Sequence, residues 1–376
     1  MKKILAVLLT LAVLVAGFPL MAFAGTKADA KAILETMTLE EKVGQLFMVR
    51  HESLKESGNV STKVTSEMKK NIKKYNLGGV ILFAQNIKDP KQIKEYTSAF
   101  QKAAPMDMFI AVDEEGGTVA RIANNPNFSV KKYQSMMAVG KSGRKSDAKA
   151  AGKTIGKYLK KYGFNLNLAP VSDIYTNPNN QVIGSRAFGT KALTVSKMVD
   201  GAISGFHESD MMCCLKHYPG HGDTSADTHT GKVYVKKSWS SMKKRELIPF
   251  IDNLDDTDMI MASHIRCTGV LENAAPASCS YTMITKKLRK ELGYDGVVIT
   301  DGMGMKAVSG SYSSGKAAVK SIKAGCDIIL CPVNFENAYN GVIKAVKKGE
   351  IKESRIDKSV LRILELKLKY GIIEPI

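Results

Sequence analysis

The chain has 376 residues, of which 44% are hydrophobic, and a formal net charge of +19 at pH 7. This length and hydrophobic content exclude an intrinsically disordered chain and fit either one large α/β barrel or two smaller domains. The lysines are scattered and not interleaved with aromatic residues, so no nucleic-acid partner is expected; the charge favours association with an anionic cell wall or membrane surface.

The first 24 residues have the layout of a secretory signal peptide. Lys2 and Lys3 precede an apolar run from Ile4 to Ala16, and the small-residue pattern Ala22-Phe23-Ala24 follows. We predict cleavage after Ala24, which makes the protein exported and extracellular or wall-associated, with residues 25–376 as a single domain. An uncleaved N-terminal membrane anchor is the alternative, because residues 4–24 are just long enough to span a bilayer.

Eight short apolar runs follow the signal and alternate with lysine-rich segments of helical period. The runs lie at 43–49, 78–83, 108–112, 164–171, 211–215, 259–263, 296–300 and 326–331. Helices are expected over 65–75, 90–103, 147–162, 192–207, 238–253, 282–292, 315–324 and 336–348, with a last one over 353–370.

Apolar runs without polar alternation suit parallel strands that are covered on both faces. Eight β-then-α units therefore predict an α/β fold with a closed (β/α)8 barrel of the TIM type. A doubly wound open sheet is the alternative, but it would normally have fewer units and a glycine-rich nucleotide loop, which we do not find.

Polar residues follow seven of the predicted strands. They are His51, Gln85, Asp113, Asp173, Lys216 with His217, His264 and Asp301. In a barrel these positions converge on one mouth, where such folds carry out chemistry. The two longest non-helical loops, at 176–189 and 216–232, both follow strands and should overhang that mouth.

The loop KHYPGHGDTSADTHT, at 216–230, holds half of the six histidines. Asp227 and His229 stand two residues apart, so in an extended backbone the carboxylate can hold one imidazole nitrogen and support a proton-donating imidazolium. A metal site is not favoured, because Pro219, Gly220 and Gly222 forbid the helix that His217 and His221 would need as ligands.

Two aspartates at strand ends have several possible roles. Asp301, beside Gly302, could be a nucleophile, a metal ligand or a helix cap. Asp113 and Arg121, in DEEGGTVAR, suit a polyhydroxylated or carboxylate-bearing ligand, or could form a plain surface ion pair. The residues alone leave both questions open.

Taken together, five segments resemble glycoside hydrolase family 3. They are KHYPGHGDTSADTH, DEEGGTVAR, NLAPVSDI, VIGSRAFG and VVITDGMGM, and the Asp-x-His loop is similar to the β-N-acetylglucosaminidase (NagZ-type) branch. The similarity extends from about Leu39 to the C-terminus. The resemblance implies a catalytic barrel domain, retention of anomeric configuration and no cofactor, and we expect no second α/β sandwich domain of the kind that many members carry.

The resemblance also assigns roles to residues. Asp301 would be the nucleophile, His229 the general acid/base and Asp227 its partner. The subsite for the terminal sugar would be lined by Asp113, Arg121, Arg186, Lys216 and His217, with His264 a possible neighbour. Two positions depart from the pattern, since Thr118 stands where arginine is frequent and Glu114 where glutamine is frequent.

The expected activity is hydrolysis of terminal non-reducing N-acetylglucosamine from peptidoglycan fragments (muropeptides) or related amino-sugar oligosaccharides. Within the family, a β-glucosidase or a β-N-acetylglucosaminide phosphorylase are alternatives. A non-catalytic wall-binding barrel is an alternative of another class.

The six cysteines do not form a disulfide framework. Cys213 and Cys214 are adjacent in one apolar run, and Cys326 and Cys331 flank another. Buried thiols are therefore expected, with Cys267 and Cys279 as the one pair that could bridge.

Overall fold

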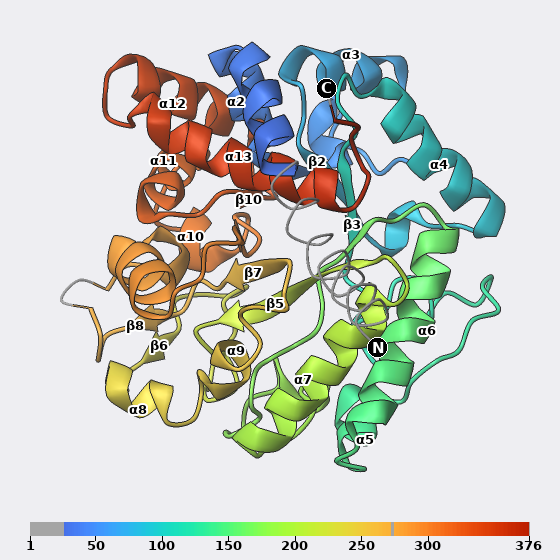
Figure 1. The fold of residues 1–376 in the computed structure, drawn as a ribbon, viewed down its shortest axis with the longest axis vertical. Helices are drawn as coiled ribbons and strands as arrows, with labels where there is room; N and C mark the ends of the chain where they lie inside the picture. Colours follow the sequence, from blue (N-terminus) through green and yellow to red (C-terminus); the bar gives the residue numbers. More distant parts are fainter. Residues whose placement is uncertain (1–25, 272–273, 376) are drawn as a thin grey trace, which may run out of the picture.

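The computed structural model describes residues 26–271 and 274–375, and eight parallel strands within these ranges form one sheet (Figure 1). The strand order is β10-β1-β2-β3-β4-β5-β7-β9. The ends of the sheet meet through a parallel bridge between Ile299 and Ile328 and a 2.9 Å hydrogen bond from Thr300 N to Ile328 O. The predicted (β/α)8 barrel is confirmed, and the signal peptide predicted at 1–24 lies outside the described residues.

Each expected apolar run contains or overlaps a barrel strand. The strands are β1 (Phe47–Arg50), β2 (Gly79–Leu82), β3 (Phe109–Val112), β4 (Leu166–Asn167), β5 (Met212–Tyr218), β7 (Met259–Ala262), β9 (Val297–Thr300) and β10 (Ile329–Leu330). A small second sheet pairs β6 (Tyr234–Val235) with β8 (Arg266–Cys267), in the connections that follow β5 and β7.

Helices surround the strands (Figure 1). They are α2 (Leu39–Gln45), α3 (Ser66–Tyr75), α4 (Pro90–Ala103), α5 (Met136–Gly140), α6 (Lys145–Lys161), α7 (Ala192–His207), α8 (Trp239–Lys243), α9 (Ile248–Ile251), α10 (Lys306–Ser309), α11 (Ser314–Ala324), α12 (Phe335–Lys347) and α13 (Glu353–Lys369). A further helix covers 26–36, and the π-type helix η5 covers Thr282–Glu291. The short 3-10 turns are η1 (His51–Leu54), η2 (Ala84–Asn86), η3 (Gly184–Arg186) and η4 (Ala277–Cys279).

Two sequence predictions were wrong in their boundaries. The strand expected over 43–49 begins at Phe47, because the capping box of Thr38 and Glu41 starts a helix that extends to Gln45. The single helix expected over 238–253 is split into α8 and α9. Pro249 has no N–H to donate and its ring clashes with the carbonyl four residues earlier, so the helix cannot continue through it.

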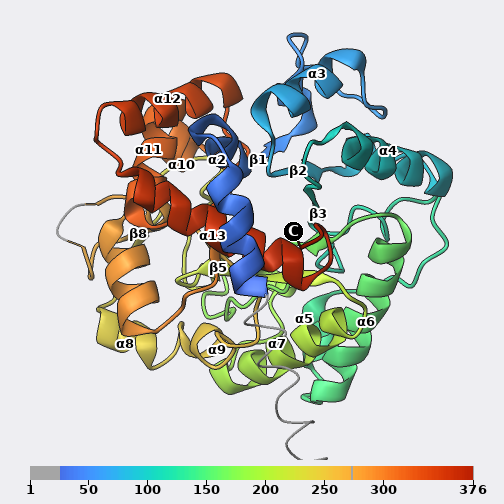
Figure 2. The ribbon, with the colours of Figure 1, turned by 45° about the horizontal axis from the view of Figure 1, so that its top comes forward.

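Two helices distant in sequence close the N-terminal end of the barrel. α13 crosses this end (Figure 2), and α2 contacts its first turn through Lys42, whose Nζ is 3.0 Å from Glu353 and 2.8 Å from Asp357. Lys367 of α13 is fully buried and donates to Gln45 of α2 at 2.7 Å. We call this end the floor of the barrel.

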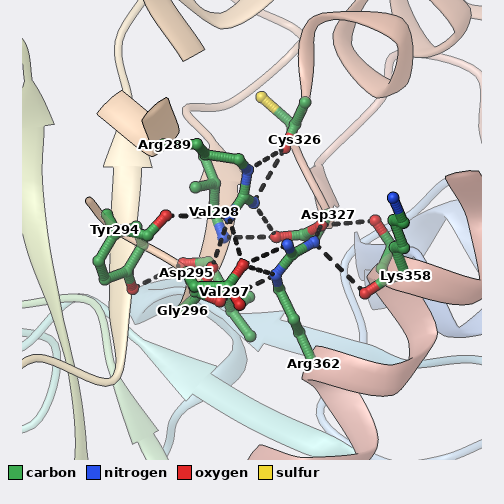
Figure 3. A network of polar contacts seen from close by, with 12 residues as sticks. Arg289, Tyr294, Asp295, Gly296, Val297, Val298, Cys326, Asp327, Lys358 and Arg362 are labelled. Atoms are coloured by element: carbon green, nitrogen blue, oxygen red, sulfur yellow. Dashed lines mark hydrogen bonds and ion pairs between the residues drawn. The ribbon is translucent and has the colours of Figure 1, made fainter. Parts of the chain in front are cut away.

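A buried aspartate organises one side of the floor (Figure 3). Asp327 precedes β10 and accepts from Arg289 at 2.5 Å and from the backbone N–H of Val298 at 2.9 Å. Its other oxygen accepts from Ser359 of α13 at 2.5 Å, and Arg355 and Arg362 of α13 lie at 3.7 Å and 3.4 Å. One carboxylate therefore links β9, β10, η5 and α13.

All six cysteines, each in the described part of the chain, are free thiols, so Cys267 and Cys279 do not form a disulfide. Among the helices of residues 26–271 and 274–375, none combines the length and the apolar character that crossing a membrane requires.

Candidate active site

A pocket of about 620 Å³ opens at the C-terminal ends of the strands. This volume is within the range of small-molecule sites, and the position is where barrels of this type carry out chemistry. Seven of the eight residues selected from the sequence line it: Asp113, Arg121, Arg186, Lys216, His217, His229 and Asp301. The eighth, Asp227, does not line the pocket and contacts His229.

Asp301 directly follows β9 and is 8% exposed. Its backbone N–H donates to Ala262 O at 2.8 Å, and one carboxylate oxygen accepts from Gly302 N at 2.7 Å. Burial tends to raise the pKa of Asp301, but His217, the Gly302 amide and Lys216 act in the opposite direction and hold it below its ordinary value. Asp301 is therefore an ionised carboxylate with a face on the pocket.

Asp227 and His229 form the expected pair. Asp227 Oδ1 lies 2.7 Å from His229 Nδ1 and also accepts from the backbone N–H of His229 at 2.8 Å. Burial tends to raise the pKa of Asp227, but these contacts with His229 lower it. Because Nδ1 is held by the carboxylate, Nε2 is the ring nitrogen left to exchange a proton with a ligand.

The loop that carries His229 is bound to the segment that follows Asp301. The backbone N–H of Ala307 donates to Thr228 O at 3.2 Å, and that of Lys306 donates to His229 O at 3.4 Å. His221 contacts two other residues of the same loop: its Nδ1 is 2.8 Å from Thr224 Oγ1, and its Nε2 is 3.5 Å from Thr228 Oγ1. These contacts hold the backbone of residues 228 and 229 next to the segment that follows Asp301.

Charged side chains that line the pocket form a compact network. Lys216 Nζ is 2.7 Å from Asp113 Oδ1 and 2.6 Å from Glu115 Oε1, and Arg186 makes two bonds to Glu115 at 2.8 Å and 2.7 Å. Although burial opposes ionisation, Arg186 and Lys216 hold the pKa of Glu115 well below its usual range. The expected Asp113–Arg121 pair is present at 3.7 Å, but Lys216 is the nearer partner of Asp113.

His217 is oriented by a buried carboxylate. Asp173 Oδ2 is 2.6 Å from His217 Nδ1, and Asp173 Oδ1 accepts from His221 N at 2.5 Å. His217 Nε2 is then 3.4 Å from an Arg186 nitrogen. Gly222 is required beside this cluster, since a Cβ there would stand 1.9 Å from Ile174 O.

Glu114, one of the two departures from the family pattern, is buried behind the loop that carries Asp113 and Arg121. Its carboxylate accepts from the backbone N–H groups of residues 121, 122 and 123 at 2.5–2.8 Å and from Tyr158 OH at 2.7 Å. Burial raises the pKa of Glu114 despite these bonds. Thr118, the other departure, is exposed and does not line the pocket.

The row of strand-end residues converges only in part. Asp113, Lys216, His217 and Asp301 reach the pocket, while Asp173 and His264 lie behind it; His264 Nε2 is 3.0 Å from Gly302 O. The prediction was wrong for His51, which is buried against Asn86 at 3.2 Å, and for Gln85, which is exposed away from the pocket. Both belong to 3-10 turns, which begin directly after β1 and one residue after β2 and rotate these side chains away from the mouth.

Sequence reasoning missed several pocket residues. Glu115 lies between the selected Asp113 and Arg121, and its spacing of two from Asp113 could have indicated it. Arg50 ends β1, and its guanidinium lies 4.8 Å from the ring centroid of Phe83 on the neighbouring strand end. His51, the strand-end residue selected from the sequence, lies one position after the residue that lines the pocket.

The fold and the site together define a (β/α)8 barrel of the enzyme type. Its pocket contains an ionised carboxylate, Asp301, and an imidazole, His229, that is held by the carboxylate of Asp227. Residues 38–366 match the model of the Glycosyl hydrolase family 3 N terminal domain. The chain belongs to this family.

Individual relatives agree with the family assignment. Beta-hexosaminidase A of Pseudoalteromonas piscicida is 33% identical over 382 residues, which cover 92% of this chain and 63% of the relative. A beta-hexosaminidase of Idiomarina loihiensis is 31% identical over 273 residues, covering 72% of this chain and 80% of the relative. A solved family 3 beta-N-acetylglucosaminidase from Paenibacillus sp. str. FPU-7 has a TM-score of 0.84 and 34% identity, and covers 90% of this chain and 63% of that one. The chain thus spans under two thirds of the first and third of these proteins.

Proposed function

We propose that this chain is a retaining exo-β-N-acetylglucosaminidase that removes terminal non-reducing N-acetylglucosamine from peptidoglycan fragments or related oligosaccharides. The observation that carries the proposal is that Asp301 and the Asp227–His229 pair, over seventy residues apart, meet at one pocket. The activities named for the relatives support an amino-sugar substrate.

In the first step, Asp301 attacks the anomeric carbon. The glycosidic C–O bond breaks, its electron pair goes to the leaving oxygen, and His229 Nε2 gives that oxygen a proton. Asp227 favours the imidazolium that holds this proton beforehand, since the two groups are in ion-pair contact.

In the second step, neutral His229 takes a proton from water, and the water oxygen attacks the anomeric carbon of the glycosyl-Asp301 intermediate. The bond to Asp301 breaks, the carboxylate is restored, and two inversions give net retention. We assign Asp113, Arg121, Arg186, Lys216 and His217 to the subsite for the terminal sugar, where their charged donors and acceptors bind hydroxyl and acetamido groups.

The activity is tested with aryl glycosides. The wild-type protein should hydrolyse an aryl β-N-acetylglucosaminide faster than the matching β-glucoside, release the β-anomer first by NMR, and lose about a thousandfold or more in kcat in Asp301→Ala. A preference for the glucoside would establish a β-glucosidase, and a wild-type protein no faster than Asp301→Ala would establish a non-catalytic barrel.

The natural substrate is tested separately, by mass spectrometry of products from purified muropeptides. Export and a wall location rest on the pattern of residues 1–24 and on the net charge, and N-terminal sequencing of the secreted protein would show whether cleavage follows Ala24.

Because His229 is uncharged after donating its proton, it does not repel an anionic acceptor. Sugar-1-phosphate formed in phosphate buffer at a rate above hydrolysis would favour the phosphorylase alternative.

A further inference from the structure

Three metal-binding side chains meet at the floor of the barrel, at the opposite end from the pocket. They are His207, the last residue of α7, Cys213, the second residue of β5, and Asp258, which directly precedes β7. They supply one nitrogen, one sulfur and one oxygen donor. Nothing in the proposed glycosidase chemistry uses them.

We propose that His207, Cys213 and Asp258 form a binding site for a zinc-class divalent cation that joins α7, β5 and β7. The inference does not depend on the proposed function.

The donor atoms already have nearly the separations that such an ion requires. His207 Nε2 is 2.9 Å from Asp258 Oδ2, and Cys213 Sγ is 3.7 Å from His207 Nε2 and 3.6 Å from Asp258 Oδ2. Tetrahedral zinc, with bonds of about 2.3 Å to sulfur and about 2.0 Å to nitrogen and oxygen, places its donors about 3.3–3.6 Å apart. Only the His207–Asp258 separation has to widen, by about 0.4 Å.

The carboxylate is positioned for this role by its other contacts. Asp258 Oδ1 is held by Lys369 Nζ at 3.0 Å and by Tyr370 OH at 2.8 Å. Oδ2 is therefore the oxygen that faces the imidazole and the thiol, and the Cys213 backbone N–H at 3.0 Å fixes its direction. Such outer contacts are typical of metal-ligating carboxylates.

The charges and protons also balance. Binding displaces the Cys213 thiol proton to solvent, and the imidazole presents its Nε2 lone pair with its proton on Nδ1. The thiolate and the carboxylate then offset the two charges of the cation, while Lys369 stays bound to the other carboxylate oxygen. Cys213 and Asp258 are buried, whereas the His207 side chain is 31% exposed, so solvent can reach the ion and supply the fourth ligand. The thiolate–imidazole pair selects zinc over magnesium or calcium.

The experiment uses cobalt(II) as a spectroscopic probe of the reduced, full-length protein. Titration should give a sulfur-to-cobalt charge-transfer band that saturates at one equivalent and disappears when zinc is added. Zinc at about a hundredfold excess over its Kd should raise the Tm by about 5 °C. Absence of the band from the wild-type protein would overturn the proposal.

Matched variants locate the ion. The band should vanish in Cys213→Ser. It should persist in Cys214→Ser, because the buried thiol of Cys214 points to the opposite face of the strand from that of Cys213. It should also persist in His229→Ala, which excludes binding at the pocket. Should Cys213→Ser fail to fold, His207→Gln decides, because cobalt affinity should fall at least tenfold, and unchanged affinity would contradict the site.

Discussion

The side chain of His229 is 62% exposed, while that of its partner Asp227 is 36% exposed. An imidazole this open to solvent depends on its carboxylate for orientation, because little packing holds the ring. The pairing was predictable from the spacing Asp-x-His alone, since both contacts to Asp227 are local in sequence.

Asp227→Asn tests the acid role. An amide cannot stabilise the imidazolium, so kcat/KM should fall about tenfold to a hundredfold more for substrates with poor leaving groups than for nitrophenyl glycosides, which need little protonation. A series of aryl β-N-acetylglucosaminides with leaving groups of different pKa measures this. Asp223→Asn in the same loop, which bonds Thr176 and Lys237, is the control and should leave the leaving-group dependence unchanged. Equal losses across the series in Asp227→Asn would contradict the assignment.

Lys367 makes stability depend on pH. Burial lowers the pKa of its ammonium to about 7, whereas an unfolded lysine has a pKa near 10.4. Between about pH 7 and pH 10 the unfolded chain therefore binds a proton that the folded chain does not. The free energy of unfolding should rise with pH in this window by up to about 1.4 kcal/mol per unit from this group.

Denaturant unfolding of Lys367→Met at several pH values checks this expectation. The rise between pH 7 and pH 10 should be smaller in this variant than in the wild-type protein and unchanged in Lys358→Met, an exposed lysine of the same helix. The same slope in all three proteins would contradict it.

Other residues of the site were not predictable because their partners are distant. Glu115 accepts a hydrogen bond from Arg186, 71 residues away in the sequence, and Asp173 contacts His217, 44 residues away. No local pattern encodes such pairs. The signal at Asp173 was its strand-end position, which does not distinguish a pocket-lining side chain from one buried behind it.

At the scale of elements, apolar runs predicted all eight barrel strands, because strands buried on both faces need no alternation. The predicted ends of two elements were wrong, because a local capping or proline effect outweighed the hydrophobic pattern there. The capping box at Thr38 extended a helix into an apolar run, and Pro249 split another. The cross-barrel contact of α2 with α13 had no sequence signal, since over 300 residues separate Lys42 from Glu353.

The contacts of Asp327 join several elements of the barrel floor, and their contribution to stability can be tested (Figure 3). Burial would raise the pKa of Asp327, but Arg289, Arg355 and Arg362 hold it below its ordinary value. Asp327→Asn leaves these guanidinium groups without their buried anion and should lower the free energy of unfolding by about 3–5 kcal/mol in urea. Asp295→Asn is the control, because Asp295 contacts Arg362 but its side chain is 85% exposed; it should cost less than about 1 kcal/mol. Comparable losses in the two variants would contradict the central role of Asp327.

At the scale of the whole molecule, a net charge of +19 predicts salt-dependent attraction to polyanions. Purified bacterial cell walls should retain most of the protein at about 50 mM salt and release it by about 500 mM, where charges are screened beyond a few ångströms. Neutral chitin particles are the control and should show little salt dependence. Equal retention on walls at both salt concentrations would contradict an electrostatic association.

The barrel brings two distant chain segments to one pocket, and the proposed mechanism requires that both act on the same carbon atom. Trapping the intermediate tests this most directly. With an activated nitrophenyl β-N-acetylglucosaminide, His229→Ala should still form the glycosyl-enzyme, because the leaving group needs no acid, but should hydrolyse it slowly, because water lacks a base. Peptide mapping by mass spectrometry should then find N-acetylhexosamine on Asp301; a trapped sugar on any other residue, or none at all, would contradict the mechanism.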